Sequence, residues 1–214
     1  MKKLIKKLEL KPLLISVGLV IFQSIFFFTA KLLQGEPHLI GSAFDHNTPY
    51  ISFFILIYCS WYLLLFIVPY YFYKKDKDTL YKYIAGYSLV AIISSIIFII
   101  YPTTLVRADL GEGLFDWITK IIYFVDTPAI NCLPSLHCAI STLFILVSLI
   151  SKKATKQFKI PVIVLSILIM ASTLLVKQHV LIDLIIGDIL MIIIFIYVNN
   201  SKKIVKFIQK LLKI

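Results

Sequence analysis

Long apolar runs, separated by short polar segments, dominate the pattern of this chain. Each run is close to the ~20 residues that an α-helix needs to cross a hydrocarbon core about 30 Å thick. Backbone polar groups inside lipid must be satisfied within their own segment, so the runs are predicted as helices rather than strands. The six predicted spans cover residues 13–33, 51–73, 83–101, 133–150, 160–177 and 182–198. The pattern therefore predicts an all-α, polytopic membrane protein with a bundle of six transmembrane helices.

The first apolar run follows a basic start, as a secretory signal would. Here "MKKLIKKLELK" precedes "PLLISVGLVIFQSIFFFTA". The apolar part is about 20 residues long, enough to span a bilayer and longer than a usual signal core. It is interpreted as a retained first span.

Composition agrees with the pattern. The chain has 214 residues and is 60% hydrophobic, against roughly 45–50% in soluble domains. A single integral membrane domain over residues 1–214, with a catalytic core at about 100–190, fits this length. Three cysteines make no disulfide framework, and Cys132 and Cys138 are predicted to pack rather than pair. The abundance of Ile and Lys suggests an AT-rich bacterial genome.

The net charge of +11 could indicate a nucleic-acid partner, but the placement of the lysines argues for topology instead. By the positive-inside rule, the face with most basic residues is cytoplasmic, which puts both termini inside. No nucleic acid is needed, and the tail "SKKIVKFIQKLLKI" is predicted as a basic amphipathic helix on anionic lipid. Eighteen of the 22 basic residues fall in four segments on this face: Lys2, Lys3, Lys6, Lys7 and Lys11; Lys74, Lys75, Lys77 and Lys82; Lys152, Lys153, Lys156 and Lys159; Lys202, Lys203, Lys206, Lys210 and Lys213.

The polar chemistry gathers on the opposite, outer face. Lys31, Arg107, Lys120 and Lys177 fall there, together with all four histidines. The segment 114–125 is predicted to lie in the interface as an amphipathic lid, since its Trp and Tyr suit that depth. His38 and His46 of the first outer loop are interpreted as solvated residues, with contact to a substrate as the alternative.

The first candidate for chemistry is the pair His179 and Asp183, four residues apart. On a helix, this spacing places both on one face with Cβ atoms about 5–6 Å apart. The carboxylate could then accept the imidazole N–H and fix its tautomer, as in a catalytic triad. The alternative is a histidine–aspartate pair at the water boundary. Asp188 is left open between a supporting role and a polar contact between helices.

The stretch "CLPSLHCAIS" supplies a second histidine. Pro134 and Ser135 are typical of a helix start, but they do not account for His137. From His137 the chain runs one span inward and one span outward, so it returns to the same membrane face near His179. A contact between the two helices would bring the two histidines together.

Arg107 is the only arginine in the chain. Its planar fork can grip phosphate oxygens bidentately, which lysine cannot do, although an ordinary interfacial charge is the alternative. Lys177 could add a second positive charge. Together these residues favour phosphoryl transfer, in which positioning and charge neutralisation dominate. One histidine could attack phosphorus and the other could protonate the leaving oxygen, while Ser135 could offer a hydroxyl and backbone N–H groups to the phosphate.

These residues resemble the type 2 phosphatidic acid phosphatase superfamily of membrane lipid phosphatases, which is related to vanadium haloperoxidases. Its P-S-x-H motif is present from Pro134 to His137. In its third motif Ser172, His179 and Asp183 match, but Thr173 stands where the family has arginine. In its first motif Arg107 matches, whereas the lysine and proline positions are Ile100 and Ala108.

The resemblance implies a role for each matching residue. His179 would form a phosphohistidine, Asp183 would orient it, and His137 would protonate the leaving group. Arg107 and Ser135 would hold the phosphate, with Lys177 as a replacement for a missing basic residue. The family is metal-independent, so no cofactor is implied; a zinc site made of the two histidines and the aspartate is disfavoured because the nearby cations would repel it.

The implied activity is hydrolysis of a lipid phosphomonoester or diphosphate. The lysine topology and the composition predict that it takes place on the outer face of a bacterial plasma membrane. The stretches "SLHCA" and "KQHVLIDLIIG" resemble more the branch of inositol phosphorylceramide and sphingomyelin synthases. That branch transfers a phosphoryl headgroup to an alcohol, which is the alternative function. A non-catalytic transporter or scaffold is the third class. Phosphatidic acid, phosphatidylglycerol phosphate and a polyprenyl diphosphate all remain open as substrates, as does the oligomeric state.

Overall fold

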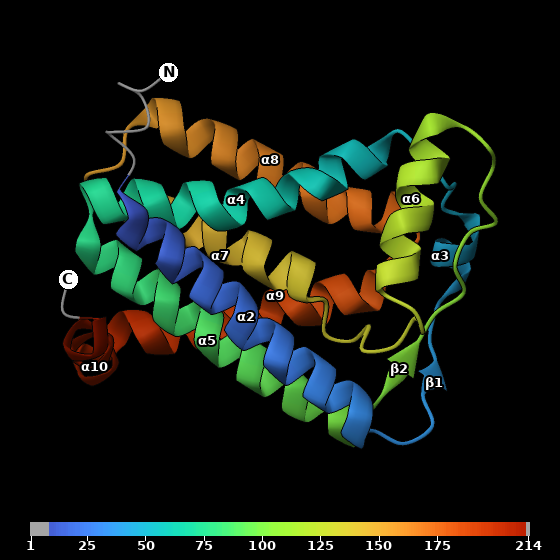
Figure 1. Ribbon diagram of the computed structural model, residues 1–214, viewed down its shortest axis with the longest axis horizontal. Coiled ribbons are helices and arrows are strands. Elements are labelled where there is room, and N and C mark those ends of the chain that lie inside the picture. Colours follow the sequence, from blue (N-terminus) through green and yellow to red (C-terminus); the bar gives the residue numbers. More distant parts are fainter. Residues whose placement is uncertain (1–8, 213–214) are drawn as a thin grey trace.

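The computed structural model describes residues 9–212 and shows an elongated helical bundle with short elements at one end (Figure 1). Five of the lysines used for the topology prediction, at positions 2, 3, 6, 7 and 213, lie outside these residues. Six long helices form the bundle: α2 (Leu10–Leu33), α4 (Phe54–Lys75), α5 (Lys77–Ile100), α7 (Leu136–Ile150), α8 (Lys156–Leu175) and α9 (Leu181–Asn200).

The all-α, multi-pass class is confirmed. Among the described residues, five helices are long and apolar enough to cross a membrane: α2, α4, α5, α8 and α9. The predicted fourth span differs, because α7 has only 15 residues, about 22 Å at 1.5 Å per residue. It is also the most enclosed helix, packed against α5, α8 and α9, and Figure 1 shows it in the middle of the bundle.

The sequence predicts a lysine-rich link over residues 74–82, between the second and third spans, but the structure continues both helices into this segment. Only Asp76 separates the two helices. Its carboxylate accepts hydrogen bonds from the Thr79 hydroxyl at 2.9 Å and the Ser151 hydroxyl at 2.7 Å, and from the Thr79 backbone N–H at 3.4 Å. A capping residue therefore sets this helix start, whereas an apolar run marks only the part of a helix that lies in hydrocarbon.

Short elements cover the opposite end of the bundle. Strand β1 (His38–Leu39) pairs in parallel with β2 (Thr103–Thr104), and α3 (Ala43–Asn47) follows β1. Helix α6 (Leu114–Val125) coincides with the predicted amphipathic stretch and crosses this end of the bundle (Figure 1). Its Thr119 and Tyr123 are buried, whereas Trp117 and Phe124 are exposed.

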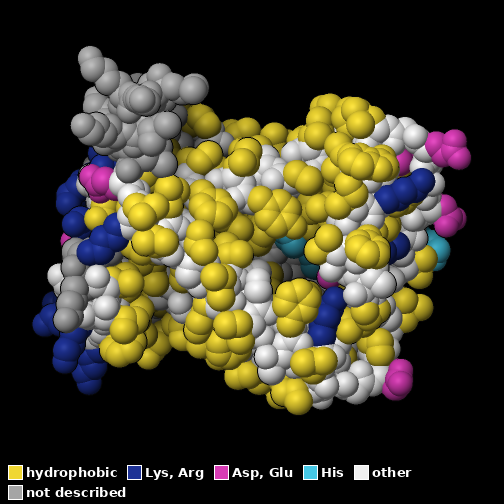
Figure 2. All heavy atoms as spheres, in the orientation of Figure 1, with side chains coloured by type: hydrophobic (Ala, Val, Ile, Leu, Met, Phe, Trp, Pro, Cys, Tyr) yellow, Lys and Arg dark blue, Asp and Glu magenta, His cyan; other side chains and the backbone are white. Residues whose placement is uncertain are grey.

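Charge on the surface follows the same division into two ends. In Figure 2, lysine side chains gather at the end that carries α10 (Lys202–Leu212), and apolar side chains fill the band between the ends. The predicted helix in the tail is confirmed over these residues. Part of its apolar face already docks on the bundle, because Ile208 is buried while Phe207 and Leu211 are exposed. Cys132 and Cys138 are buried and free, as the prediction of packing required.

Candidate active site

A tight turn between α8 and α9 carries His179. Lys177 adopts a left-handed φ of 53° in this turn, and the Thr173 carbonyl accepts the N–H groups of Gln178 and His179 at 3.0 and 3.2 Å. His179 therefore precedes α9 instead of lying on its face, as the four-residue spacing had suggested. Because the turn is bonded back to α8, the histidine is held in one position.

Asp183 lies in the first turn of α9 and is fully buried. Its Oδ2 accepts the backbone N–H of Val180 at 3.1 Å and lies 3.2 Å from Nδ1 of His179. The carboxylate thus caps the helix and orients the imidazole at the same time. Since Nδ1 faces the carboxylate, Nε2 is the nitrogen of His179 left for chemistry.

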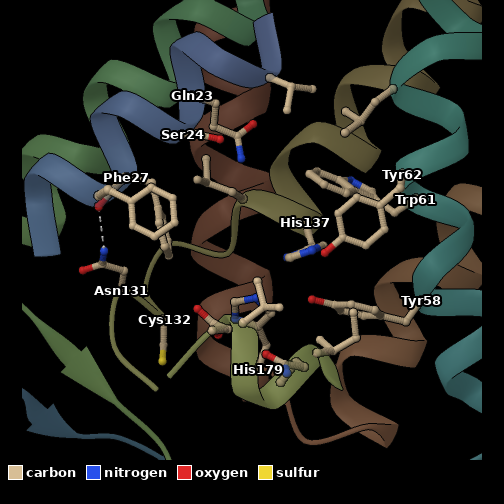
Figure 3. Close-up of a pocket in the computed structure, with 18 of the residues that line it drawn as sticks. Gln23, Ser24, Phe27, Tyr58, Trp61, Tyr62, Asn131, Cys132, His137 and His179 are labelled. Atoms are coloured by element: carbon tan, nitrogen blue, oxygen red, sulfur yellow. Dashed lines mark hydrogen bonds between the residues drawn. The ribbon is translucent and has the colours of Figure 1, made fainter. Parts of the chain in front are cut away.

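His137 opens α7, and its ring centroid lies 5.7 Å from that of His179. Its imidazole packs against Trp61 at 4.4 Å and Tyr58 at 4.7 Å between centroids. Its Nε2 is buried and has no hydrogen-bond partner among the described residues. The two histidines thus lie side by side, as the topology argument predicted, and Figure 3 shows His137 among the aromatic side chains of α4.

The starts of α7 and α9 are locked together through backbone groups. The Ser135 N–H donates to the Asp183 carbonyl at 3.0 Å, and the Ser135 hydroxyl accepts the Cys138 N–H at 3.3 Å. Gly187 lets the two helices approach, since a Cβ there would lie 2.6 Å from the Ser135 carbonyl oxygen. Ser135 is therefore a buried cap, and its own N–H already has a protein partner.

We expect Gly187→Ala to lower the melting temperature by several degrees. The added methyl meets backbone, so α7 and α9 must separate, and overpacking of this kind costs about 1–3 kcal/mol. The shift also moves His137 relative to His179, so turnover should fall with stability. Thermal unfolding in detergent measures the first effect. Gly18→Ala is the control, because nothing lies within 4 Å of the added carbon; an equal effect of the two substitutions would contradict the steric argument.

Arg107 is engaged by an acidic partner that the sequence reasoning missed. Its guanidinium donates to the Tyr123 carbonyl at 2.8 Å and to the Asp126 carboxylate at 2.8 Å. Lys31 lies 3.5 Å from the other oxygen of the same carboxylate. Burial raises the pKa of Asp126, although Lys31 and Arg107 both act to lower it. No spacing rule links position 107 to position 126, so only the fold reveals this pair.

Lys177 points away from the histidine pair toward α3. Its Nζ donates to the Asp45 backbone carbonyl at 2.5 Å. The Asp45 carboxylate accepts the Leu181 N–H at 2.7 Å, so α3 is tied to the start of α9 at two points. Burial acts to raise the pKa of Asp45, but hydrogen bonds from Ser42 and Leu181 and the charge of Lys177 outweigh it, and the pKa is lowered.

Two cavities meet at His179. The inner cavity, of about 210 Å³, is mostly apolar and contains both histidines and Asp126. The outer cavity, of about 600 Å³, is lined by Arg107 and Lys177 among others. Within residues 9–212, His179 is the one residue that lines both. A group bound at His179 thus has aromatic and apolar surroundings on one side and basic side chains on the other.

Comparison with known families fits this geometry. A profile of the PAP2 superfamily matches residues 25–197, from α2 to α9. The chain belongs to the PAP2 superfamily. Membership indicates phosphatase-type chemistry on phosphate esters. Neither a curated protein nor a solved structure matches the chain.

The departures from the PAP2 motifs have structural counterparts. Thr173, at the position of the family's arginine, is buried and donates its hydroxyl to the Met170 carbonyl at 2.7 Å. Ile100, at the position of the family's lysine, is exposed at the end of α5. Neither position brings a charge to the histidine pair, so the positive charge nearest the site comes from other residues.

Three further polar residues singled out in the sequence also have defined positions. Asp188 of α9 accepts a hydrogen bond from the Thr142 hydroxyl of α7 at 2.7 Å, so it is a polar contact between helices. His38 stacks on Tyr101 with centroids 4.8 Å apart. His46 is exposed, as the solvated role predicted from the sequence requires, and it also borders the outer cavity.

Proposed function

We propose that this protein is a membrane lipid phosphate phosphatase that works through a phosphohistidine on His179. The observation that carries the proposal is the cluster of His137, His179 and Asp183 at the junction of an apolar and a polar cavity. A lipid phosphate has the same two-sided character. Its chains suit the inner cavity, and its anionic group suits the basic residues of the outer one.

The proposed reaction has two steps. Nε2 of His179 attacks phosphorus, and the bond from phosphorus to the lipid oxygen breaks. His137 gives a proton to that oxygen, while Asp183 stabilises the positive ring of His179. In the second step His137 takes a proton from water, and the resulting hydroxide attacks the phosphohistidine. Inorganic phosphate leaves and both histidines return to their first state.

Positive charge for the phosphate would come from Arg107 and Lys177, both of which border the outer cavity. Arg107 is already paired with Asp126, so a bound phosphate would compete with that carboxylate for the guanidinium. Ser135 would contribute by capping α7, because the positive end of a helix favours an anion. Metal independence belongs to this proposal and is tested by activity in EDTA.

The proposed topology places both termini in the cytoplasm and the site on the outer face of a bacterial plasma membrane. This topology needs six spans, so α7, the predicted fourth span, must also cross the membrane although it has only 15 residues. The lysines at the α4–α5 junction and on α10 support it, since they lie at the end of the bundle opposite α3 and α6 (Figures 1 and 2). Accessibility of engineered surface cysteines on α3 and α10 to an impermeant reagent in intact cells tests this arrangement.

Transfer of a phosphoryl headgroup to an alcohol is the second candidate. The acceptor must approach phosphorus opposite His179, on the side of His137. That side is lined by Tyr58, Trp61 and other apolar groups, which favour a lipid alcohol over water. The chemistry at the two histidines is the same in both candidates.

A substrate panel distinguishes the two functions. Purified protein in detergent and EDTA is given phosphatidic acid, phosphatidylglycerol phosphate or a polyprenyl diphosphate, with and without a lipid alcohol. Release of inorganic phosphate, independent of the alcohol, is the expected result. A new phosphodiester that forms only with the alcohol would favour the transferase. Absence of both products with every lipid would overturn the proposal.

A further inference from the structure

The inner cavity contains a polar group deep within a membrane helix. Gln23 belongs to α2 and lies about 15 Å along the helix from its outer end at Leu33. Polar side chains at this depth are costly and usually face a protein interior or a functional cavity. Gln23 and its neighbour Ser24 both line the inner cavity, and Figure 3 shows them on α2 beside the space next to His137.

Only half of the Gln23 amide is used by the protein. The buried Tyr87 hydroxyl of α5 donates to Oε1 of Gln23 at 2.5 Å. The amide nitrogen has no partner within residues 9–212, and neither does the Ser24 hydroxyl. Tyr87 therefore fixes the orientation of the amide and leaves its N–H groups directed away from the acceptor oxygen. Two unused donors thus border a cavity that also contains the two histidines.

We propose that the inner cavity binds an acyl-linked lipid, and that Gln23 and Ser24 hydrogen-bond its ester or amide carbonyls. This inference rests on the proposed function, since it assumes that a lipid phosphate reacts at His179. In a diacyl lipid the carbonyls lie one glycerol unit from the phosphate, so one molecule can reach both parts of the cavity. A polyprenyl phosphate has only hydrocarbon beyond its phosphate and offers no acceptor to these donors. Gln23 thereby selects among the lipids that the motifs leave open.

A purely structural role for Gln23 has a different consequence. Its bond to Tyr87 joins α2 to α5, which pack closely along their lengths, and polar contacts of this kind hold membrane helices together. Loss of a structural contact would lower stability and slow every substrate equally. Loss of a carbonyl contact would slow only substrates that have the carbonyl. The ratio of rates therefore separates the two roles.

The test compares diacyl phosphatidic acid, its dialkyl ether analogue and farnesyl phosphate. For the wild type we expect kcat/KM to be about 5- to 30-fold higher for the diacyl lipid than for the ether, as one or two hydrogen bonds would give. Gln23→Leu should remove most of this difference, by slowing the diacyl lipid alone and leaving only the contact from Ser24. Ser24→Ala removes one hydroxyl and changes the side-chain volume little, so it should reduce the ratio of rates only in part. Thr29→Val, on the exposed side of α2, should preserve it.

Two results would overturn the inference: equal rates for ester and ether in the wild type, or equal slowing of all three lipids in Gln23→Leu. A binding measurement covers the case in which no lipid is turned over. His179→Ala protein is incubated with an equal mixture of the diacyl and dialkyl lipids, and bound lipid is counted by native mass spectrometry. An excess of the diacyl lipid supports the inference even if the proposed reaction fails, and equal binding refutes it.

Discussion

Replacement of His179 by alanine is expected to lower turnover of a lipid phosphate by about 10⁴-fold or more. The substitution removes the nucleophile, and in covalent catalysis its loss leaves only the effects of binding and charge. The inner cavity should survive, because the ring is one of many groups that line it. The measurement is release of inorganic phosphate from phosphatidic acid by purified protein of normal melting temperature.

A labelling experiment gives this prediction a second readout. Lipid labelled with ³²P in the phosphate, quenched in base during turnover, should leave acid-labile label on the wild type and none on His179→Ala. The matched control is His38→Ala, which removes a histidine that stacks on Tyr101 and lines neither cavity. Full labelling or full turnover of His179→Ala would remove the phosphohistidine from the mechanism.

Much of the candidate site could be predicted from residue types and topology. The return of the chain to one membrane face predicted that His137 and His179 meet, and the structure brings their rings to 5.7 Å. Asp183 also lies beside His179 as predicted, but for a different structural reason. Its carboxylate reaches His179 by capping α9, whereas a helix face had been expected. A hydropathy pattern locates a span, but it does not reveal the capping residue that sets where the helix begins.

The partners of the basic residues could not be predicted. Arg107 and Asp126 come from segments on either side of α6, and their contact depends on how that helix crosses the bundle. Lys177 turns toward α3 because its backbone adopts a left-handed conformation, which the sequence does not mark with a glycine. The inner cavity arises from the packing of α2, α4 and α6 around α7. The outer one is formed by residues 39–48, residues 105–109 and the α8–α9 turn, so no single segment contains the signal for either cavity.

Replacement of His137 by glutamine should have an effect that depends on the leaving group. If His137 protonates the departing lipid oxygen, its loss should slow an alkyl phosphate by about 10²- to 10⁴-fold. Formation of the phosphoenzyme from p-nitrophenyl phosphate should be slowed much less, because nitrophenolate leaves without a proton. His137→Gln should then show a burst of nitrophenolate, since the same side chain is needed to activate water for the second step.

The burst distinguishes catalysis by His137 from a packing role. His137 contacts Trp61 and Tyr58 closely, so a merely disturbed cavity would slow both substrates alike and give no burst. Glutamine keeps a polar side chain of similar size, and the melting temperature reports whether the contact with α4 survives. His38→Gln serves as the control outside both cavities. Because the nucleophile and Asp183 remain in place in this variant, equal slowing of the alkyl and nitrophenyl substrates would assign His137 to structure and leave the proton donor to another group.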